Sequence, residues 1–288
     1  MKLFLKLMCV GHCLCAGACS INQATVRPVT WIDDRAITDS IDNFIEKDET
    51  AIPAKALQTN IPEHVSLLLP NQSESDIIDL YSYAIDSIVI ISGSGYCGRC
   101  DKRHGSTTGT GFFISESGAI ATNFHIINGT GSGFYATTVD GTTYPIINVL
   151  AANESQDIAI VEIENRHASF VPLPVSTDAL VGESVWVIGH PDHRYFTFTD
   201  GIVSRYRKTI SKKNIESITY EMMITAPFSP GSSGGPVLTA KGNVVGIVRS
   251  RETVGSTRHK GHAHAEIPAQ VAHSCIPSSQ FLELILCK

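Results

Sequence analysis

A serine in a glycine-rich turn is the residue of this sequence best suited to covalent chemistry. Ser233 lies in the run Gly231-Ser232-Ser233-Gly234-Gly235-Pro236. A serine hydroxyl is a weak nucleophile at neutral pH, so it needs a general base and a site for the developing oxyanion. Glycines around it let the backbone turn sharply and direct its amides to one point. Such runs also occur in ordinary β-turns, so the turn alone is weak evidence for catalysis.

A histidine and an aspartate upstream complete a candidate set of proton-transfer groups. His125 ends the run Thr-Asn-Phe-His, which follows an apolar strand, and Asp157 opens the apolar run Ile-Ala-Ile-Val. Taken singly, this histidine would be read as a satisfied core residue and this aspartate as a turn or cap residue. The joint order His, Asp, Ser favours catalysis instead. Asp140 and Asp178 are weaker alternatives, because no apolar strand follows either of them.

Short β-branched segments carry these residues, and turn-forming residues separate the segments. Runs rich in Val, Ile and Thr that are bounded by Gly, Asn, Asp and Ser are typical of strands. The sequence predicts strands over residues 87–92, 110–115, 119–122, 146–150, 158–163, 184–188, 219–225, 236–238 and 244–248. Many short strands at this spacing indicate a closed antiparallel barrel or a sandwich.

Helices are predicted at both ends of this β-rich region. After Asp33 and Asp34, apolar residues recur at the spacing of one helix face, at positions Ile37, Ile41, Phe44 and Ile45. Another turn or two is predicted over residues 76–84. The last helix is predicted over residues 278–286, with an apolar side made of Phe281, Leu282, Ile285 and Leu286.

Together these segments resemble the trypsin-like serine proteases, specifically their HtrA/DegP-like branch. The motifs of that branch are matched in order by residues 108–113, 122–125, 157–160 and 231–236. Residues 181–189 and 200–204 are similar to its inter-strand region, and residues 276–278 to its closing segment. The resemblance covers roughly residues 76–288. It implies an all-β, chymotrypsin-like fold of two six-stranded antiparallel β-barrels, with a short C-terminal helix and a partly helical N-terminal arm.

Residue chemistry and the resemblance together imply a role for each group. Ser233 attacks the peptide carbonyl, and His125 takes its proton and later gives it to the leaving amine. Asp157 holds the imidazole in the useful tautomer and stabilises its charged form. The N–H groups of Gly231 and Ser233 are expected to form the oxyanion hole, at about 3–4 kcal/mol per donor. The expected reaction is hydrolysis of polypeptides through an acyl-enzyme, without a cofactor.

The primary substrate pocket is expected to contain no Asp or Glu. The resemblance implies that residues 227–230 and 246–250 form it, with Phe228 and Val248 as side-chain walls. This favours cleavage after small or medium apolar residues and disfavours it after Lys or Arg. Arg249 and Arg251 are interpreted as solvated surface residues, with a preference for acidic groups as the alternative. Ser232 stands where digestive enzymes carry an aspartate that pairs with a newly cut N-terminus, so activation of that kind is not expected.

Composition excludes several other functions. The chain has 288 residues, 22 Lys+Arg against 28 Asp+Glu and a net charge of −6. Without a basic stripe, it is not expected to bind nucleic acid. Its 43% hydrophobic content is typical of a globular protein, not of a disordered one. Beyond residue 20, no apolar run approaches the roughly 20 residues that a membrane helix requires.

The first 18 residues are interpreted as an export signal. Lys2 and Lys6 precede a short apolar stretch that ends in Ala-Gly-Ala. Two readings of the cleavage remain open: ordinary signal peptidase, or a lipobox in which Cys19 is lipidated and tethers the protein to a membrane. The mature protein is then expected to be periplasmic, secreted or lipid-anchored. Residues 19–75 would form an arm or tether, and residues 76–168 and 169–288 would form the two barrels.

Length and cysteine content set further expectations. Only 55 residues (288 − 233) follow Ser233, fewer than a PDZ domain would need, so none is expected. Cys97 and Cys100 are interpreted as a loop disulfide, with a redox pair or half of a zinc site as alternatives. The alternating His262, His264 and Glu266 are interpreted as a polar surface loop, so no metal is expected.

Two functions from different classes remain. The first is an exported endopeptidase that acts on unfolded or loosely folded proteins. The second is a catalytically quiescent trypsin-like module that only binds. The complete set of His125, Asp157 and Ser233 favours the enzyme.

Overall fold

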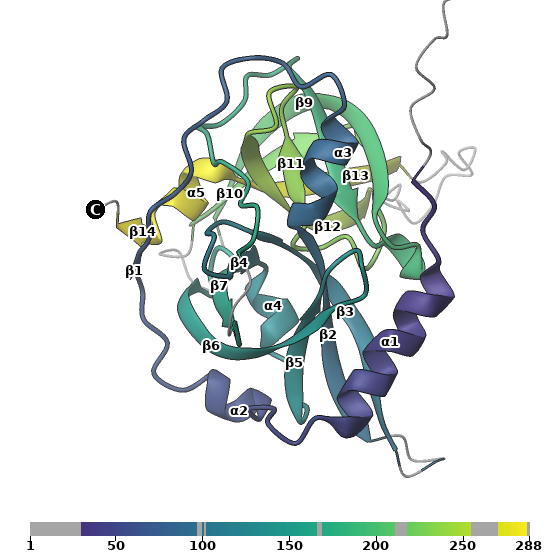
Figure 1. Cartoon of the computed structure of the whole chain (residues 1–288). Coiled ribbons are helices and arrows are strands. Elements are labelled where there is room, and N and C mark those ends of the chain that lie inside the picture. Colours follow the sequence, from purple (N-terminus) through teal and green to yellow (C-terminus); the bar gives the residue numbers. More distant parts are fainter. Residues whose placement is uncertain are drawn as a thin grey trace, which may run out of the picture. The chain divides into compact units, whose positions relative to one another are not determined.

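Two closed antiparallel barrels of six strands each make up most of the described chain (Figure 1). The structure is a computed structural model that describes residues 30–96, 100, 102–165, 169–210, 218–254 and 270–286. The export signal, Cys19, Cys97 and the His262–Glu266 cluster lie outside the described residues. The all-β, double-barrel fold predicted from the sequence is confirmed.

The first barrel is closed in the order β2-β3-β4-β7-β6-β5. Its strands are β2 (Ile88–Tyr96), β3 (Arg103–Phe113), β4 (Ala119–Thr122), β5 (Gly133–Thr137), β6 (Thr143–Asn153) and β7 (Ile158–Ile163). Strand β2 is buried on both faces, because Ile88 and Ile90 belong to one core and Val89 and Ile91 to another. This explains why its sequence is a continuous apolar run without alternation.

The second barrel is closed in the order β10-β13-β12-β11-β8-β9. Its strands are β8 (Ser184–Gly189), β9 (Thr197–Ile210), β10 (Ile218–Ile224), β11 (Pro236–Leu238), β12 (Val244–Val254) and β13 (Gln270–Pro277). A separate core fills it, with Val187, Met222 and Val248 among its members. The helical turns α3 (Leu80–Ala84) and η1 (Ile85–Ser87) lead into β2. Within the barrels, α4 (Phe124–Ile127) lies between β4 and β5, and η2 (Pro191–His193) lies between β8 and β9.

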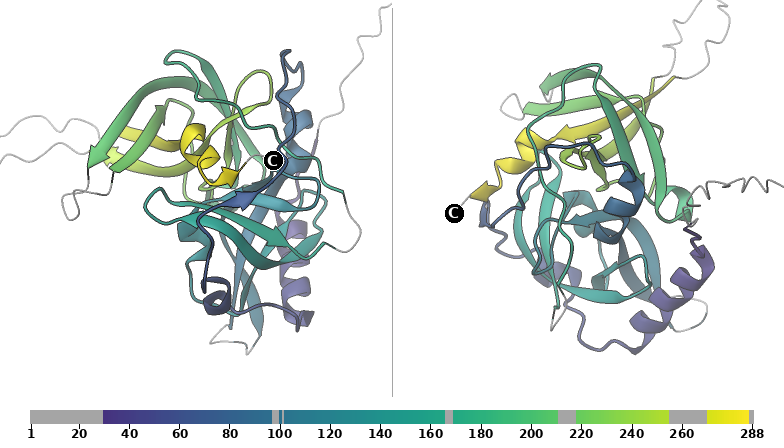
Figure 2. Two further views of the ribbon diagram at one scale, coloured as in Figure 1. Left: turned by 90° about the vertical axis from the view of Figure 1, so that its left-hand side faces the viewer. Right: turned by 45° about the horizontal axis from the view of Figure 1, so that its top comes forward.

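Residues 32–75 pack on the barrels and belong to the same compact unit, Ile32–Lys288. Helix α1 (Asp34–Lys47) begins at its cap Asp33, whose side chain accepts a hydrogen bond from the Ala36 N–H, so the helix predicted here is confirmed. It lies along β3 (Figures 1 and 2), where Ile41 and Ile45 pack closely on Gly105. Helix α2 (Ala54–Leu57) adds Ala54 and Leu57 to the core of the first barrel.

The end of the chain differs from the prediction. The helix expected over residues 278–286 is too long: α5 (Ser278–Leu282) stops early, and Ile285 and Leu286 form the strand β14 (Ile285–Leu286). This strand pairs in parallel with β1 (Val65–Ser66). Of the predicted apolar side, Phe281 and Ile285 are buried, whereas Leu286 is exposed. Pairing with a segment more than two hundred residues away therefore overrides the local helical pattern.

Three strands of the two barrels were not predicted, each for a local reason. Strand β5 is short and flanked by glycines, which read as a turn. Strand β9 contains Asp200-Gly201, also a turn signal, but a side chain at Gly201 would lie 2.2 Å from the Ala226 nitrogen. Strand β13 carries Gln270, His273 and Ser274 and has a weak β pattern. None of the helices in the described residues is long and apolar enough to span a membrane.

Candidate active site

His125 and Asp157 lie in direct contact. His125 lies in α4, just beyond β4, and Asp157 immediately precedes β7. The imidazole Nδ1 is 2.8 Å from Asp157 Oδ2, and the backbone N–H of His125 donates to Asp157 Oδ1 at 2.9 Å. The side chain of His125 is 49% exposed and that of Asp157 is 13% exposed. The carboxylate therefore binds the histidine ring and its backbone at once.

The backbone of Asp157 is also tied to the segment that carries His125. Its φ of +62° is in the left-handed region, which aspartate adopts more readily than most residues. Its carbonyl accepts from the Phe124 N–H at 3.2 Å and from Asn123 Nδ2 at 3.0 Å. With the two bonds to His125, both the carbonyl and the carboxylate hold α4 in place. This arrangement fixes the ring independently of any ligand.

The turn around Ser233 requires its glycines. Gly231 has φ +98° and Gly234 has φ +86°, and a Cβ at either position would lie within 2.2 Å of a backbone oxygen. Thr110 of β3 fastens this turn to the first barrel: its N–H donates to the Ser233 carbonyl at 2.7 Å and its hydroxyl to the Gly231 carbonyl at 2.8 Å. The turn thus lies at the junction of the two barrels.

The hydroxyl of Ser233 is hydrogen-bonded to a backbone carbonyl in this structure. Its Oγ donates to the Arg249 carbonyl at 3.0 Å. Among the described residues, no hydrogen bond joins Ser233 Oγ to His125. A serine hydroxyl turns about a single bond, and catalytic hydrogen bonds are often formed only when substrate is bound.

Two backbone N–H groups beside Ser233 are available. Neither the N–H of Gly231 nor that of Ser233 donates a hydrogen bond to another described residue. The carbonyl of Pro230 is engaged elsewhere, because it accepts from the Asp192 N–H at 2.9 Å. Gly231 and Ser233 are both partly exposed, so these two donors at one turn can reach a bound ligand, an arrangement suited to bind an oxyanion.

A pocket of about 370 Å³ lies beside His125, Asp157 and Ser233. It is lined by His125, Asp157, Phe228, Ser229, Pro230, Ser233 and Arg249. Of the two wall residues expected from the sequence, Phe228 lines the pocket. Val248 does not: it is fully buried in the core of the second barrel. Arg249, expected at the surface, lines the pocket in its place.

The two rival aspartates have structural roles elsewhere. Asp140 accepts hydrogen bonds from Thr138 and Thr142 within one turn. Asp178 accepts from the Ser278 hydroxyl and the Ser279 N–H at the start of α5. Neither belongs to the pocket around Ser233.

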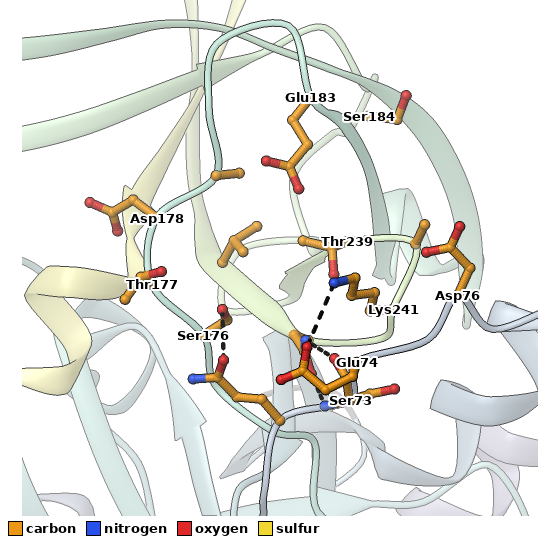
Figure 3. A pocket seen from close by; sticks show the side chains of 15 residues that line it. Ser73, Glu74, Asp76, Ser176, Thr177, Asp178, Glu183, Ser184, Thr239 and Lys241 are labelled. Carbon is orange, nitrogen blue, oxygen red and sulfur yellow. Dashed lines mark hydrogen bonds and ion pairs between the residues drawn. The ribbon is translucent and has the colours of Figure 1, made fainter.

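Asp178 contributes instead to a second pocket of about 300 Å³ that shares no residue with the first. Figure 3 shows its acidic and hydroxyl side chains around Lys241, whose ammonium lies 4.0 Å from Glu74. The side-chain amide of Asn243, which lines this pocket, forms two hydrogen bonds with the Ser73 backbone and so joins two segments of the chain.

Cysteine and histidine meet at the outer end of β3. The sulfur of Cys100 lies 3.0 Å from His104 Nε2, and His104 Nδ1 lies 3.4 Å from Asp42 Oδ2. Cys97, the expected disulfide partner of Cys100, lies outside the described residues, and Cys100 itself is a free cysteine in this structure. In the described part of the chain, no three His, Cys, Asp or Glu side chains are arranged to hold a metal ion.

Comparison with known proteins agrees with this geometry, since residues 109–247 match the family model of the trypsin-like peptidase domain. These residues, just under half of the chain, are therefore similar to trypsin-like peptidases. The matched residues include all three residues of the candidate active site, His125, Asp157 and Ser233.

Relatives of this peptidase domain are HtrA/DegP-like. Protease Do-like 1, chloroplastic, of Arabidopsis thaliana is 35% identical over 143 residues, which cover 49% of this chain and 32% of that protein. A Chlamydia pneumoniae protein named "Probable periplasmic serine endoprotease DegP-like" is 32% identical over 139 residues, 48% of this chain and 28% of that protein. The chain therefore spans less than a third of the length of these relatives.

A solved structure shares the fold. An HtrA-type protease determined with a decapeptide aligns with a TM-score of 0.53 and 18% identity, over 71% of this chain and 64% of that one. The described residues therefore share the double-barrel fold that the resemblance implied.

Proposed function

We propose that the chain is an exported serine endopeptidase in which His125, Asp157 and Ser233 hydrolyse peptide bonds of unfolded or loosely folded proteins. The observation that carries the proposal is the turn at Ser233. Ser233 lines the same pocket as the His125–Asp157 pair, and its own N–H and that of Gly231 donate no hydrogen bond to another described residue. A module that only bound peptides would not need unpaired donors beside a serine.

The chemistry follows from this arrangement. The Asp157 carboxylate accepts the Nδ1–H of His125, which leaves Nε2 as the proton acceptor. The Ser233 hydroxyl turns from the Arg249 carbonyl to Nε2, loses its proton there and attacks the carbonyl carbon. The oxyanion of the tetrahedral intermediate is bound by the N–H groups of Gly231 and Ser233.

Breakdown of the intermediate then cleaves the substrate. The C–N bond breaks as the imidazolium gives its proton to the leaving amine, and an ester of Ser233 remains. Water, deprotonated by His125, attacks this ester, and the departing Ser233 oxygen regains a proton. After one turnover Ser233 and His125 have regained their starting protonation states, one peptide bond and one water have become a carboxyl and an amine, and no metal or cofactor is needed.

Labelling with a fluorophosphonate probe tests the proposal. We expect the probe to modify Ser233, because phosphonylation needs an aligned base and an open oxyanion site. Ser233→Ala should lose both labelling and casein cleavage, by several orders of magnitude, with an unchanged melting temperature. If the wild-type protein is folded but neither labelled nor active, the quiescent binding module is the better description. Cleavage by Ser233→Ala at the wild-type rate would remove this serine from the mechanism.

Export is part of the same proposal. Two observations support it: Lys2 and Lys6 precede a short apolar stretch at the start of the sequence, and the name of the Chlamydia relative describes that protein as periplasmic. Intact-mass measurement of the protein from a cell-envelope fraction decides between the two cleavage readings. A chain beginning at Cys19 with added acyl mass supports the tether, and an unmodified Cys19 supports free secretion. Retention of Met1 would contradict export.

A further inference from the structure

Arg249 occupies an unexpected place in the pocket. It follows Val248 in β12, and its carbonyl accepts the Ser233 hydroxyl. Its side chain lines the pocket and is 24% exposed. The guanidinium lies between two carboxylates, with Nε 3.6 Å from Asp157 Oδ2 and Nη1 3.9 Å from Glu221 Oε1. A positive charge therefore lies in the same pocket as the serine, where the sequence predicted Val248 as the wall residue.

Both carboxylates are already satisfied by other donors. Asp157 accepts the two N–H groups of His125. Glu221, which is buried, accepts from Arg207 Nε at 2.6 Å, from the Ser274 hydroxyl at 3.0 Å and from the Thr209 hydroxyl at 3.2 Å. Burial acts to raise the pKa of Glu221, but the bonds from Arg207 and Ser274 and the charge of Arg249 lower it, so Glu221 stays ionised. Glu221 thus holds Arg249 in position by charge.

The N–H groups of the Arg249 guanidinium have no hydrogen-bond acceptor among the described residues. Both of its ion-pair distances exceed hydrogen-bond length, and within the described structure it donates no hydrogen bond. A guanidinium carries five N–H donors in a planar fork that fits a carboxylate in a bidentate manner. Partly buried donors without acceptors are costly, and an acceptor on a bound ligand relieves that cost.

We propose that Arg249 is a specificity-determining residue that makes this pocket select substrate side chains ending in a carboxylate. The aliphatic part of a glutamate packs on Phe228 and Pro230, and its carboxylate binds the guanidinium. This inference rests on the proposed function and replaces the expectation of a wholly apolar pocket. It keeps the expected exclusion of Lys and Arg, because a substrate cation would meet the charge of Arg249.

A matched peptide series measures this selectivity. Four internally quenched peptides differ only at the residue before the scissile bond, which is Glu, Gln, Val or Lys. Gln has the shape of Glu without its charge, so the Glu/Gln ratio of kcat/KM isolates the carboxylate. For the wild-type protein we expect a ratio of roughly 10 to 100, typical of one charge-assisted, bidentate contact, and the slowest cleavage for Lys.

Variants assign the ratio to Arg249. In Arg249→Gln the Glu/Gln ratio should fall to near one, and Arg249→Lys should retain part of it. Arg205→Gln, an exposed arginine of β9 outside the pocket, should keep the wild-type ratio. A general loss of activity affects both peptides and cancels in the ratio. Wild-type protein that prefers Gln or Val to Glu, or Arg249→Gln with an unchanged ratio, would overturn the proposal.

Binding separates this inference from the catalytic proposal. In Ser233→Ala, fluorescence anisotropy gives the affinities of the Glu and Gln peptides without turnover. The same preference in this background, and its loss on adding Arg249→Gln, supports the selector role even if the wild-type protein proves inactive. Equal affinities in Ser233→Ala, together with a wild-type kcat/KM ratio near one, would reject the selector role while leaving the peptidase function intact.

Discussion

The Asp157 carboxylate binds both the ring and the backbone N–H of His125, and these two contacts differ in what they require. The backbone contact needs only an oxygen acceptor at Oδ1. The contact with Nδ1 also fixes which ring nitrogen carries the proton. A substitution that keeps the contact with the backbone N–H but replaces the acceptor at Nδ1 by a donor would therefore change the tautomer of His125 without moving its backbone.

Asp157→Asn makes this separation. The amide oxygen can still accept the His125 N–H, but the amide NH₂ then meets Nδ1 and forces the proton onto Nε2, where a base cannot form. We expect kcat for a peptide to fall by about 10³–10⁴-fold with little change in melting temperature. Asp140→Asn, a turn carboxylate of the same barrel, serves as the control and should retain kcat. A kcat within tenfold of wild type for Asp157→Asn would contradict the role of Asp157.

At the same scale, the sequence predicts the reactive groups better than the pocket around them. Sequence motifs identify Ser233, His125 and Asp157, and these motifs can be recognised without knowing how the side chains pack. Arg249 is not, because the pairing of β12 with β13 shifts register between Val248 and Ser250. Such a bulge breaks the alternation of side chains along a strand. The sequence therefore assigns Val248 to the pocket and Arg249 to the surface, whereas the structure has Val248 buried.

At the scale of elements, His190 joins the barrels next to the Ser233 turn. It follows β8 and is fully buried. Its Nε2–H donates to the Val89 carbonyl of β2 at 3.1 Å, and its Nδ1 accepts the Phe196 N–H at 3.0 Å. Its own carbonyl lies where a Cβ on Gly231 would clash. Only the neutral imidazole can make both ring contacts.

This geometry makes the junction sensitive to acid. Burial lowers the pKa of His190 from 6.5 to about 4. Above pH 6.5 the folded and unfolded chains both hold this ring neutral. As the pH falls from 6.5 to about 4, only the unfolded chain takes up the proton, so the free energy of unfolding decreases. The decrease is complete below about pH 4. The full loss is on the order of 3 kcal/mol.

His190→Gln isolates this contribution. Gln offers a donor and an acceptor but does not titrate, so the free energy of unfolding should change less between about pH 6.5 and 4.5 than it does in wild type. Urea unfolding at several pH values measures the difference. His193→Gln, at an exposed position nearby, should keep the wild-type slope. The interpretation fails if His190→Gln and wild type show parallel pH profiles, whatever their stabilities at neutral pH.

Elements with a strong local pattern were predicted and those with a weak one were not. Strands β4, β7 and β11 have the predicted bounds, because each is a short, mostly apolar run. Strand β9 was not predicted, because Asp200-Gly201 in its interior resembles a turn. The glycine there serves close contact with Ala226 of the neighbouring chain segment. The sequence alone does not reveal a contact between residues that lie so far apart along the chain.

For the molecule as a whole, one core crosses the boundary between the barrels. The same buried cluster contains Ile45 of α1, Phe112 of β3, Ile188 of β8, Leu238 of β11 and Phe281 of α5. The candidate active site lies at this junction, with the histidine and aspartate on one barrel and the serine on the other. Neither barrel can therefore unfold without exposing apolar surface of its neighbour.

This shared core leads us to expect one cooperative unfolding transition for residues 32–288, with equal calorimetric and van't Hoff enthalpies. Ile45→Ala should lower that transition as a whole, by about 2–5 kcal/mol, because Ile45 is fully buried against β3. Arg35→Ala, on the exposed side of the same helix, should leave it within about 0.5 kcal/mol. Scanning calorimetry of the full chain, with peptide hydrolysis followed over the same temperatures, measures both. Two separate transitions, or an Ile45→Ala variant that loses α1 early and keeps the main transition, would mean that residues 32–75 act as a detachable arm, as the sequence alone suggested.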